Sequence, residues 1–321
     1  MPPSGKLALM HVLGIDAGGT KTVALLADAD GRIVGEGRGG GANLQANGEL
    51  DVEKVLHQVI DLALDGRPIV PASVCLGLAG GDRDDDGDLI RGIMRRLGFR
   101  DHTLIVNDAL IALVAGAGGL QPGVVLISGT GSIAYGVSDR GVAARAGGWG
   151  SALGDEGSAY WVGRRALAAV VRAGDGRASR TQLTELVLAH FKLERPDQLV
   201  AEIYDNVGGA TIASLEESVE RARAQGDAVA VEIMRDAASE LALAVASVVS
   251  RLEMRGDRFP TFLAGGMLTR VPWLAGEVTR RIAEVAPRSV VAPLPEEPAS
   301  GAVWLALAAA RGDVRVPPYI Q

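Results

Sequence analysis

The same order of strands and turns occurs twice in this sequence. Residues 12–31 contain an apolar strand, a turn rich in glycine and threonine, a second strand and a second turn, and residues 124–141 repeat that order. Alternating β-forming residues around Gly, Ser and Asp turns are typical of hairpins. We therefore predict two related α/β domains with a boundary near residues 116–123. The length of 321 residues is enough for two separate hydrophobic cores.

Strands and helices alternate in the rest of the chain. Hydrophobic residues make up 48% of the sequence and aromatic residues only 4%, so the cores are built from Ala, Val, Leu and Ile. That composition suits parallel strands covered by helices. The second half of the chain is predicted to be mostly helical. Further strands are predicted at 74–78, 103–106, 261–264 and 289–292, and helices at 51–64, 88–97, 109–117, 158–173, 227–255, 273–285 and 299–310.

Charge and composition exclude several classes of protein. The net charge is −7, and the sequence has no basic cluster of the kind that nucleic-acid binders carry. The longest apolar stretch away from the N-terminus, 241–249, is too short to cross a bilayer, and the N-terminus does not resemble a signal peptide. Cys75 is the only cysteine, so no internal disulfide can form. We expect a cytoplasmic protein without nucleic-acid or membrane partners.

A first candidate ligand site follows the first predicted strand. That strand ends at Asp16, and the turn after it contains Gly18, Gly19, Thr20 and Lys21. Backbone N–H groups and a hydroxyl in such a turn can bind phosphate, and a carboxylate beside it can hold Mg²⁺ through water. It is not a Walker A loop, because Thr20 stands where that motif requires lysine. The alternative interpretation is an ordinary hairpin turn.

A second turn of the same kind follows the first strand of the repeat. It contains Gly129, Thr130 and Gly131, and with Ala134 it matches the dinucleotide-binding pattern G-x-G-x-x-A. That pattern must open a helix, whereas residues 133–141 indicate a hairpin. We therefore interpret the segment as a second phosphate-binding turn and not as a Rossmann motif.

Two further positions each allow a structural and a functional interpretation. Asp108 lies between a predicted strand and a predicted helix. Its carboxylate can cap the helix or act as a general base toward a hydroxyl that attacks phosphorus. Gly265 and Gly266 follow a predicted strand, where they either end that strand or let a flat ring lie against the backbone.

The densest cluster of glycines lies at 147–160, G-G-W-G-S-A-L-G-D-E-G-S-A-Y. Glycines lose much conformational entropy on folding, so a cluster of them indicates positive φ angles or close contact with a ligand. The segment also carries an Asp-Glu pair and two aromatic residues and leads into a helix. We interpret it as a sugar-binding loop of a two-domain kinase.

Together these motifs resemble those of the sugar kinase/actin/Hsp70 superfamily. Within it, the sequence is similar to the N-acetylglucosamine kinases of the BadF/BadG/BcrA/BcrD ATPase family. The resemblance extends over nearly the whole chain. It is most specific at residues 14–22, 77–82, 107–109, 124–132 and 147–161.

The resemblance implies a fold of two RNase H-like (actin-like ATPase) domains with an interdomain active-site cleft. The first domain would comprise residues 1–118, with a C-terminal helix at about 302–321 packed back on it. The larger second domain would comprise 119–301 and carry helical insertions. The family resemblance also leads us to expect a homodimer.

The resemblance further implies an ATP-dependent kinase acting on the 6-hydroxyl of N-acetylglucosamine or a close hexosamine. Asp108 would be the catalytic base, and Asp16 would bind the Mg²⁺ that accompanies ATP, through water. The amino-sugar contacts would be Asn43, Asp108, Gly148, Trp149, Gly150 and Asp155. The ATP contacts would be Gly18, Gly19, Thr20, Lys21, Gly129, Thr130, Gly131, Gly265 and Gly266.

Other functions are possible within the same superfamily. Glucosamine or N-acetylmuramic acid could be the preferred substrate, because the sequence does not reveal the space around the sugar's third oxygen. A remote alternative is an activator ATPase of a 2-hydroxyacyl-CoA dehydratase. Such an activator needs two cysteines per subunit for its iron–sulfur cluster, and this chain has Cys75 alone. A sugar-responsive repressor would need a DNA-binding segment, and only about ten residues precede the first strand.

Overall fold

The computed structural model describes residues 10–44, 48–81, 84–100, 102–205 and 208–320. Asp82, the last residue of the predicted 77–82 motif, lies outside these ranges. The chain divides into two compact units. One contains residues 1–125, 135–144 and 292–321, and the other contains residues 126–134 and 145–291. Within the described part of the chain, no helix combines the length and apolar character needed to span a membrane.

The first unit contains a five-stranded mixed sheet with the strand order β3-β2-β1-β4-β5. Strands β1, β2 and β3 form an antiparallel meander, whereas β4 and β5 continue the sheet parallel to β1. The carboxyl ends of β1, β4 and β5 therefore lie along one edge of the sheet. The strands are β1 (His11–Ala17), β2 (Thr22–Asp28), β3 (Ile33–Gly39), β4 (Ser73–Leu78) and β5 (Thr103–Asn107).

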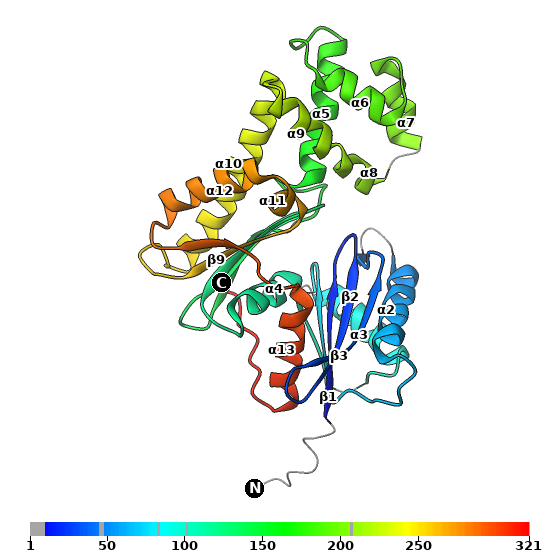
Figure 1. The fold of residues 1–321 in the computed structure, drawn as a ribbon, viewed down its shortest axis with the longest axis vertical. Helices are drawn as coiled ribbons and strands as arrows, with labels where there is room; N and C mark the ends of the chain where they lie inside the picture. The colour runs from blue at the N-terminus through cyan, green and yellow to red at the C-terminus, as the bar shows by residue number, and fades with distance from the viewer. Residues whose placement is uncertain (1–9, 45–47, 82–83, 101, 206–207, 321) are drawn as a thin grey trace. The chain divides into compact units, whose positions relative to one another are not determined.

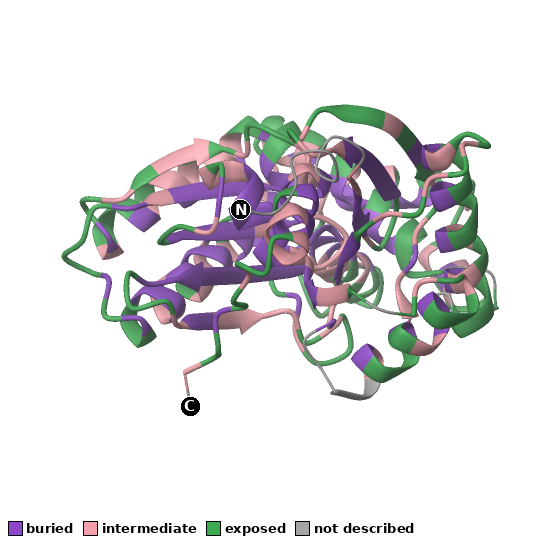
Figure 2. Cartoon of the chain, turned by 90° about the horizontal axis from the view of Figure 1, so that it is seen from below, coloured by how far each residue is buried: buried purple, intermediate pink, exposed green. Residues whose placement is uncertain are grey.

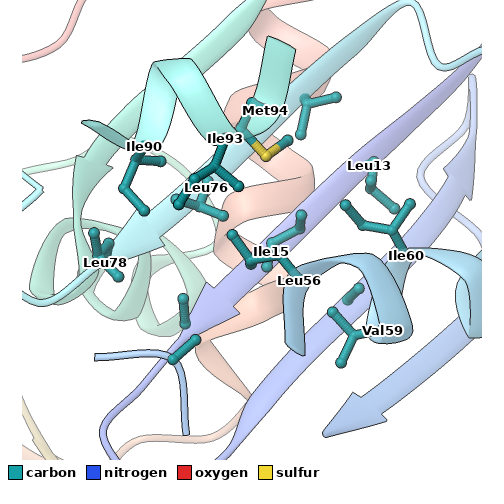
Figure 3. Close-up of a cluster of buried hydrophobic side chains, with 14 of the residues drawn as sticks. Leu13, Ile15, Leu56, Val59, Ile60, Leu76, Leu78, Ile90, Ile93 and Met94 are labelled. Carbon is teal, nitrogen blue, oxygen red and sulfur yellow. The ribbon is translucent and has the colours of Figure 1, made fainter. Parts of the chain in front are cut away.

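Helices α2 (Glu49–Leu64) and α3 (Asp84–Arg96) cover one face of this sheet. Figure 3 shows their apolar side chains packed against those of β1 and β4 in one buried cluster. Successive side chains of a strand point to opposite faces, so Leu13 and Ile15 belong to this cluster and Gly14 does not. The sequence pattern of these strands thus determines which face receives which helix.

Helices α4 (Asp108–Ala117) and α13 (Pro298–Ala310) pack together and lie against β1 and β4 (Figure 1). Glycines allow this close approach. A β-carbon on Gly14 would lie 2.4 Å from the backbone N of Val303, and one on Gly301 would lie 1.9 Å from the carbonyl O of Ile111. The C-terminal helix is therefore held rigidly against the first strand.

The second sheet has the strand order β10-β9-β6-β7-β8. When strands are numbered in chain order within each sheet, and the second sheet is read from β8 to β10, both sheets have the arrangement 3-2-1-4-5. The predicted repeat is confirmed, and it extends to β8, a third strand that the sequence pattern did not predict. The mixed α/β fold with two related sheets is as expected for the superfamily. The strands are β6 (Gly123–Ser128), β7 (Ser132–Val137), β8 (Ala143–Gly147), β9 (Pro260–Ala264) and β10 (Val290–Pro293).

Helices make up most of the second unit, as the sequence predicted. The long α10 packs against α5, α9 and α12, and α5 also contacts α6 and α8. Figure 2 shows that the inner strands of the sheets are largely buried, while the outer sides of helices are exposed. The elements are α5 (Ala159–Gly174), α6 (Leu183–Phe191), the 3₁₀ turn η2 (Pro196–Gln198), α7 (Leu199–Asp205), α8 (Gly209–Ser214), α9 (Glu216–Ala224), α10 (Ala228–Arg251), α11 (Gly266–Arg270) and α12 (Pro272–Val285).

Candidate functional site

Two carboxylates lie at the carboxyl edge of the first sheet. Asp16 is near the end of β1, opposite Gly77 of β4, and Asp108 begins α4 directly after β5. Asn107 is the N-cap of α4, and its Oδ1 accepts a 2.9 Å hydrogen bond from the backbone N–H of Ala109. Oδ1 of Asp108 accepts from the same N–H at 3.0 Å. The capping position thus belongs to Asn107, and the half-buried Asp108 carboxylate lies one residue further on.

Asp16 is almost fully buried, with 8% of its surface exposed. The pKa of its carboxyl group is raised from an ordinary 3.8 to about 7, mainly because burial removes it from water and secondly because Asp108 carries a like charge. The ammonium of Lys21 opposes the shift. A buried carboxylate at this edge therefore favours the approach of a further cation.

The turn that follows Asp16 is closed by backbone hydrogen bonds. The N–H of Gly18 donates to the carbonyl of Lys21 at 3.0 Å, and the N–H of Ala42 donates to the carbonyl of Gly18 at 3.0 Å. The second bond places the half-buried Asn43, a predicted sugar contact, in the segment beside the turn. A β-carbon on Gly19 would meet no atom within 4 Å. The fold leaves open space at that glycine, as a ligand-binding turn requires.

Lys21 is engaged by a carboxylate from the other end of the chain. Its ammonium lies 3.1 Å from Oε1 of Glu297, the N-cap residue of α13. Arg38 of β3 binds the same carboxylate through both Nη atoms, at 2.9 and 2.6 Å. Hydrogen bonds from Arg38 lower the pKa of Glu297 to about 2. No local motif in the sequence indicated this cluster, because its members lie up to 276 residues apart.

In the second unit, the turn at 128–132 and the loop at 147–160 form one hydrogen-bonded assembly. The hydroxyl of Ser128 donates to the carbonyl of Gly157 at 2.9 Å, and that of Ser132 donates to the carbonyl of Glu156 at 2.8 Å. Backbone bonds add to it: Gly148 N–H donates to Ser132 at 2.8 Å, and Ala159 N–H donates to Gly129 at 2.9 Å. The two predicted motifs therefore hold each other in place.

Asp155 lies at the centre of this assembly. It is buried, with 8% exposure, and its backbone has a φ of 56°, in the left-handed region. A β-carbon on Gly131 would lie 2.8 Å from its Oδ2, whereas one on Gly129 would meet nothing closer than 3.9 Å. Gly131 thus makes room for the acid, and Gly129 has open space beside it. Thr130, between them, is half-buried.

The tip of the loop exposes an aromatic ring. Trp149 is 55% exposed, and Gly148 and Gly150 on either side of it have φ angles of 69° and 87°. The guanidinium of Arg145 lies over the indole, 4.8 Å from the ring centroid. Positive φ angles therefore explain part of the glycine density. They also present Trp149 toward solvent, where a sugar ring can stack.

Gly265 and Gly266 connect the same assembly to α11. Gly265 has a φ of 86°, and a β-carbon there would lie 2.3 Å from the carbonyl O of Ser128. The guanidinium of Arg270 lies close to Gly266 and donates a 2.6 Å hydrogen bond to the buried Glu216. A cavity of about 370 Å³ is lined by Glu216, Glu217, Glu220, Arg221, Arg270 and Val271.

The predicted site residues thus fall into two groups. One, in the first unit, contains Asp16, the turn Gly18–Lys21, Asn43 and Asp108. The other, in the second unit, contains Gly129–Gly131, the loop 148–155 and Gly265–Gly266. Among the described residues, no cluster of three or more His, Cys, Asp or Glu side chains could hold a metal ion. Beside the predicted residues the structure also places Glu297, Arg38, Arg145 and Arg270, which no sequence motif indicated.

Two curated proteins are similar to this chain over nearly their whole lengths. An N-acetylmuramic acid/N-acetylglucosamine kinase from Clostridium acetobutylicum is 36% identical over 304 residues, which cover 93% of this chain and 98% of that protein. An N-acetyl-D-glucosamine kinase from Dictyostelium discoideum is 31% identical over 309 residues, which cover 92% of this chain and 97% of that protein.

Solved structures show the same fold. The structure of a provisionally named N-acetylglucosamine kinase from Chromobacterium violaceum has a TM-score of 0.73 and 27% identity, and covers 94% of this chain and 99% of that one. The glucokinase of the ROK family from Streptomyces griseus, solved with glucose and AMPPNP, has a TM-score of 0.57 and 18% identity, covering 94% of this chain and 98% of that one. The family model of the BadF/BadG/BcrA/BcrD ATPases matches residues 13–306. The chain therefore belongs to the BadF/BadG/BcrA/BcrD ATPase family.

Proposed function

We propose that this protein is an ATP-dependent amino-sugar kinase that phosphorylates the 6-hydroxyl of N-acetylglucosamine or a close hexosamine. Curated relatives that are named as kinases of N-acetylglucosamine match this chain over almost their entire lengths. The observation that carries the proposal is the joined assembly in which Ser128 and Ser132 bind the 147–160 loop and the Asp155 carboxylate lies against Gly131. A phosphate turn and a sugar loop fixed to each other suit a phosphoryl transfer to a sugar.

In this proposal, ATP is bound by the two glycine turns. The phosphates contact the backbone and threonine hydroxyls of Gly18–Lys21 and Gly129–Gly131. The open space at Gly19 and Gly129 supports this role, because neither glycine is required by contacts with the protein itself. The adenosine lies against Gly265 and Gly266, with the Arg270 side chain beside it. Backbone N–H groups in such turns make a concave anion site.

The described residues offer too few ligands to bind Mg²⁺ by themselves, so the ion would be bound together with ATP. Asp16 supplies one buried carboxylate whose raised pKa shows that its charge lacks full compensation. Mg²⁺ keeps several waters and is usually held by one or two carboxylates together with substrate phosphates, so Asp16 would hold it through water. When bound, the ion would neutralise charge on the phosphates.

The sugar is bound by Asn43, the backbone at Gly148–Gly150, the Trp149 ring and the carboxylate of Asp155. Asp108 takes the proton from the 6-hydroxyl as the oxygen attacks the γ-phosphorus. One O–P bond forms to the sugar, the bond to the β-phosphate oxygen breaks, and ADP leaves. Positioning and charge neutralisation supply most of the rate in reactions of this class.

The names of the relatives point to two alternatives to N-acetylglucosamine, namely N-acetylmuramic acid and glucosamine. The Clostridium acetobutylicum protein is named for both N-acetylmuramic acid and N-acetylglucosamine, and a 28% identical protein from Vibrio cholerae is named a glucosamine kinase, although it covers only 56% of this chain. The activator ATPase finds no support in the structure. Cys75, the only cysteine, is buried in β4, and burial raises the pKa of its thiol, so the thiol is not presented for an iron–sulfur cluster.

A panel of amino sugars in a coupled ADP-release assay tests the proposal. We expect N-acetylglucosamine to release ADP at a rate well above the sugar-free background, with the product phosphorylated at oxygen 6 by NMR. N-acetylmuramic acid and glucosamine distinguish the alternatives. Background rates with all three sugars would overturn the assignment.

A further inference from the structure

Lys21, Arg38 and Glu297 form a cluster of ion pairs in the first unit, in which both cations bind the same carboxylate. Arg38 binds Glu297 in a two-pronged pair, through Nη1 to Oε1 at 2.9 Å and Nη2 to Oε2 at 2.6 Å. Such paired contacts fix a carboxylate in position and orientation more firmly than a single contact does. The Lys21 ammonium lies 3.1 Å from Oε1 of Glu297. Lys21 is thus bound by a carboxylate whose own position is fixed by Arg38.

The position of Glu297 is fixed by the packing of α13. Glu297 immediately precedes the helix, and its carbonyl accepts hydrogen bonds from both the N–H and the hydroxyl of Ser300, each at 2.9 Å. The helix is pressed against β1 at Gly14 and against α4 at Gly301, with no space for a β-carbon at either glycine. At its other end, Arg311 donates a 2.8 Å hydrogen bond to the carbonyl of Ala29. Glu297 therefore stands at a defined place relative to the end of β1.

We propose that Glu297 is a positioning residue for the nucleotide: it holds the Lys21 ammonium at the first phosphate turn, ready for the anionic phosphates of ATP. This inference rests on the proposed function and adds a residue to it. A lysine side chain loses much rotational entropy when it is fixed in one conformation. Holding Lys21 beforehand reduces the loss on binding. An ammonium has three N–H donors, so Lys21 can contact phosphate while it stays on Glu297, whose two oxygens are also bound by Arg38.

Two variants of Glu297 separate positioning from simple charge. Glu297→Gln keeps the length of the side chain and removes its charge, whereas Glu297→Asp keeps the charge and shortens the reach by one methylene. We expect both to raise the KM for ATP about 3- to 10-fold, as suits the loss of one pre-organised contact, with the KM for the sugar unchanged. If the carboxylate only repelled phosphate, Glu297→Gln would lower the KM for ATP and Glu297→Asp would leave it unchanged.

Glu36 provides a matched control. It is an exposed carboxylate on β3 that binds Nε of the same Arg38, but Lys21 contacts Glu297 instead. Glu36→Gln removes one charge beside this cluster but not the contact between Lys21 and Glu297, so the ATP and sugar KM values of the variant should equal those of the wild type. An equal effect of Glu36→Gln and Glu297→Gln would mean that net charge alone matters and would overturn the proposal.

A double-mutant cycle with Lys21→Met tests whether Glu297 acts through Lys21. The Lys21→Met variant should bind ATP more weakly, and adding Glu297→Gln should then have no further effect, because the group to be positioned is gone. Binding of AMPPNP in the presence of MgCl₂, measured by calorimetry, gives a readout independent of turnover. Additive losses in the cycle would overturn the proposal.

The outcomes distinguish this inference from the proposed function. If the wild-type protein neither releases ADP nor binds AMPPNP, the proposed kinase function fails. If the wild type is an active kinase and both Glu297 variants match it in ATP affinity, only the positioning role fails. Thermal unfolding of each variant completes the test, since a fall in stability with equal changes in both KM values would show a purely structural role.

Discussion

A β-carbon on Gly131 would lie 2.8 Å from Oδ2 of Asp155. The turn proposed to bind phosphate and the acid proposed to bind sugar therefore share one tightly packed contact, although they lie 24 residues apart. This contact makes the sugar side of the site sensitive to a change on the phosphate side.

Gly131→Ala should displace the Asp155 carboxylate. The new methyl group needs the space that Oδ2 occupies, and the acid is buried with little room to move. We expect the KM for the sugar to rise by roughly 10-fold or more, which corresponds to about 1.4 kcal/mol of lost binding. Steady-state kinetics with the sugar varied measures this. An unchanged KM would mean that Asp155 keeps its position or does not contact the sugar.

Gly129→Ala is the matched substitution two residues earlier. Its β-carbon would have ordinary contacts, at 3.9 Å or more, so the folded protein can accommodate it. We expect an unchanged melting temperature together with a large loss of ATP affinity, because the methyl group enters the space proposed for phosphate. AMPPNP calorimetry and thermal unfolding of the same sample provide the two values. Normal nucleotide affinity would show that the space beside Gly129 is not used.

Asp108→Asn tests the general base. Asparagine keeps the shape of the side chain and an oxygen that can accept from the Ala109 N–H, as Oδ1 does now at 3.0 Å. We expect sugar binding within a few-fold of wild type and a fall in kcat of roughly 10²- to 10⁴-fold, the usual range for loss of a general base. Sugar binding by calorimetry and kcat by ADP release separate the effects. Near-normal turnover would refute the role of Asp108.

Asp155→Asn tests the proposed sugar contact without disturbing the backbone. Residue 155 has a φ of 56°, and asparagine tolerates this left-handed conformation far better than alanine does. The KM for the sugar should rise sharply, because asparagine replaces one acceptor oxygen by an NH₂ group that only donates and also removes the negative charge, while AMPPNP affinity stays nearly unchanged. Asp155→Ala should show the same pattern with an added loss of stability. Equal losses for sugar and nucleotide would instead indicate a structural role.

Asp16 should make the stability of the metal-free protein depend on pH. Its folded-state pKa, about 7, lies above its ordinary 3.8. Ionisation therefore costs more in the folded state, and the contribution of Asp16 to stability falls as pH rises from about 4 to 7. Asp16→Asn removes this cost, so the variant should be more stable than wild type by about 2–4 kcal/mol at pH 8 and nearly equal to it at pH 4.

Thermal unfolding of both proteins in EDTA at pH 4, 6 and 8 checks this. The difference between variant and wild type should grow over that interval, since other titrating groups are common to both. A difference that does not change with pH would contradict the burial and charge environment described for Asp16.

Much of the fold could be predicted because its signals are local. Alternating β-forming residues around glycine turns predicted both hairpins, and short apolar runs predicted the buried strands. β8 was missed, because Ala143–Gly147 has neither the alternation nor the branched side chains of a strand. Its place in the sheet comes from pairing with β7 in the repeated order.

The sequence by itself supplied the candidate residues. Asp16, Asp108, Asp155 and the glycine turns became candidates through short local motifs and through the family resemblance that those motifs carry. Only the tertiary structure decided why each glycine is needed at its position and which residues pair with the charged side chains. Gly19 and Gly129 face open space, whereas Gly131 makes room for Asp155. Lys21 meets Glu297 only because α13 packs against β1, and a contact over 276 residues leaves no periodic trace in the sequence.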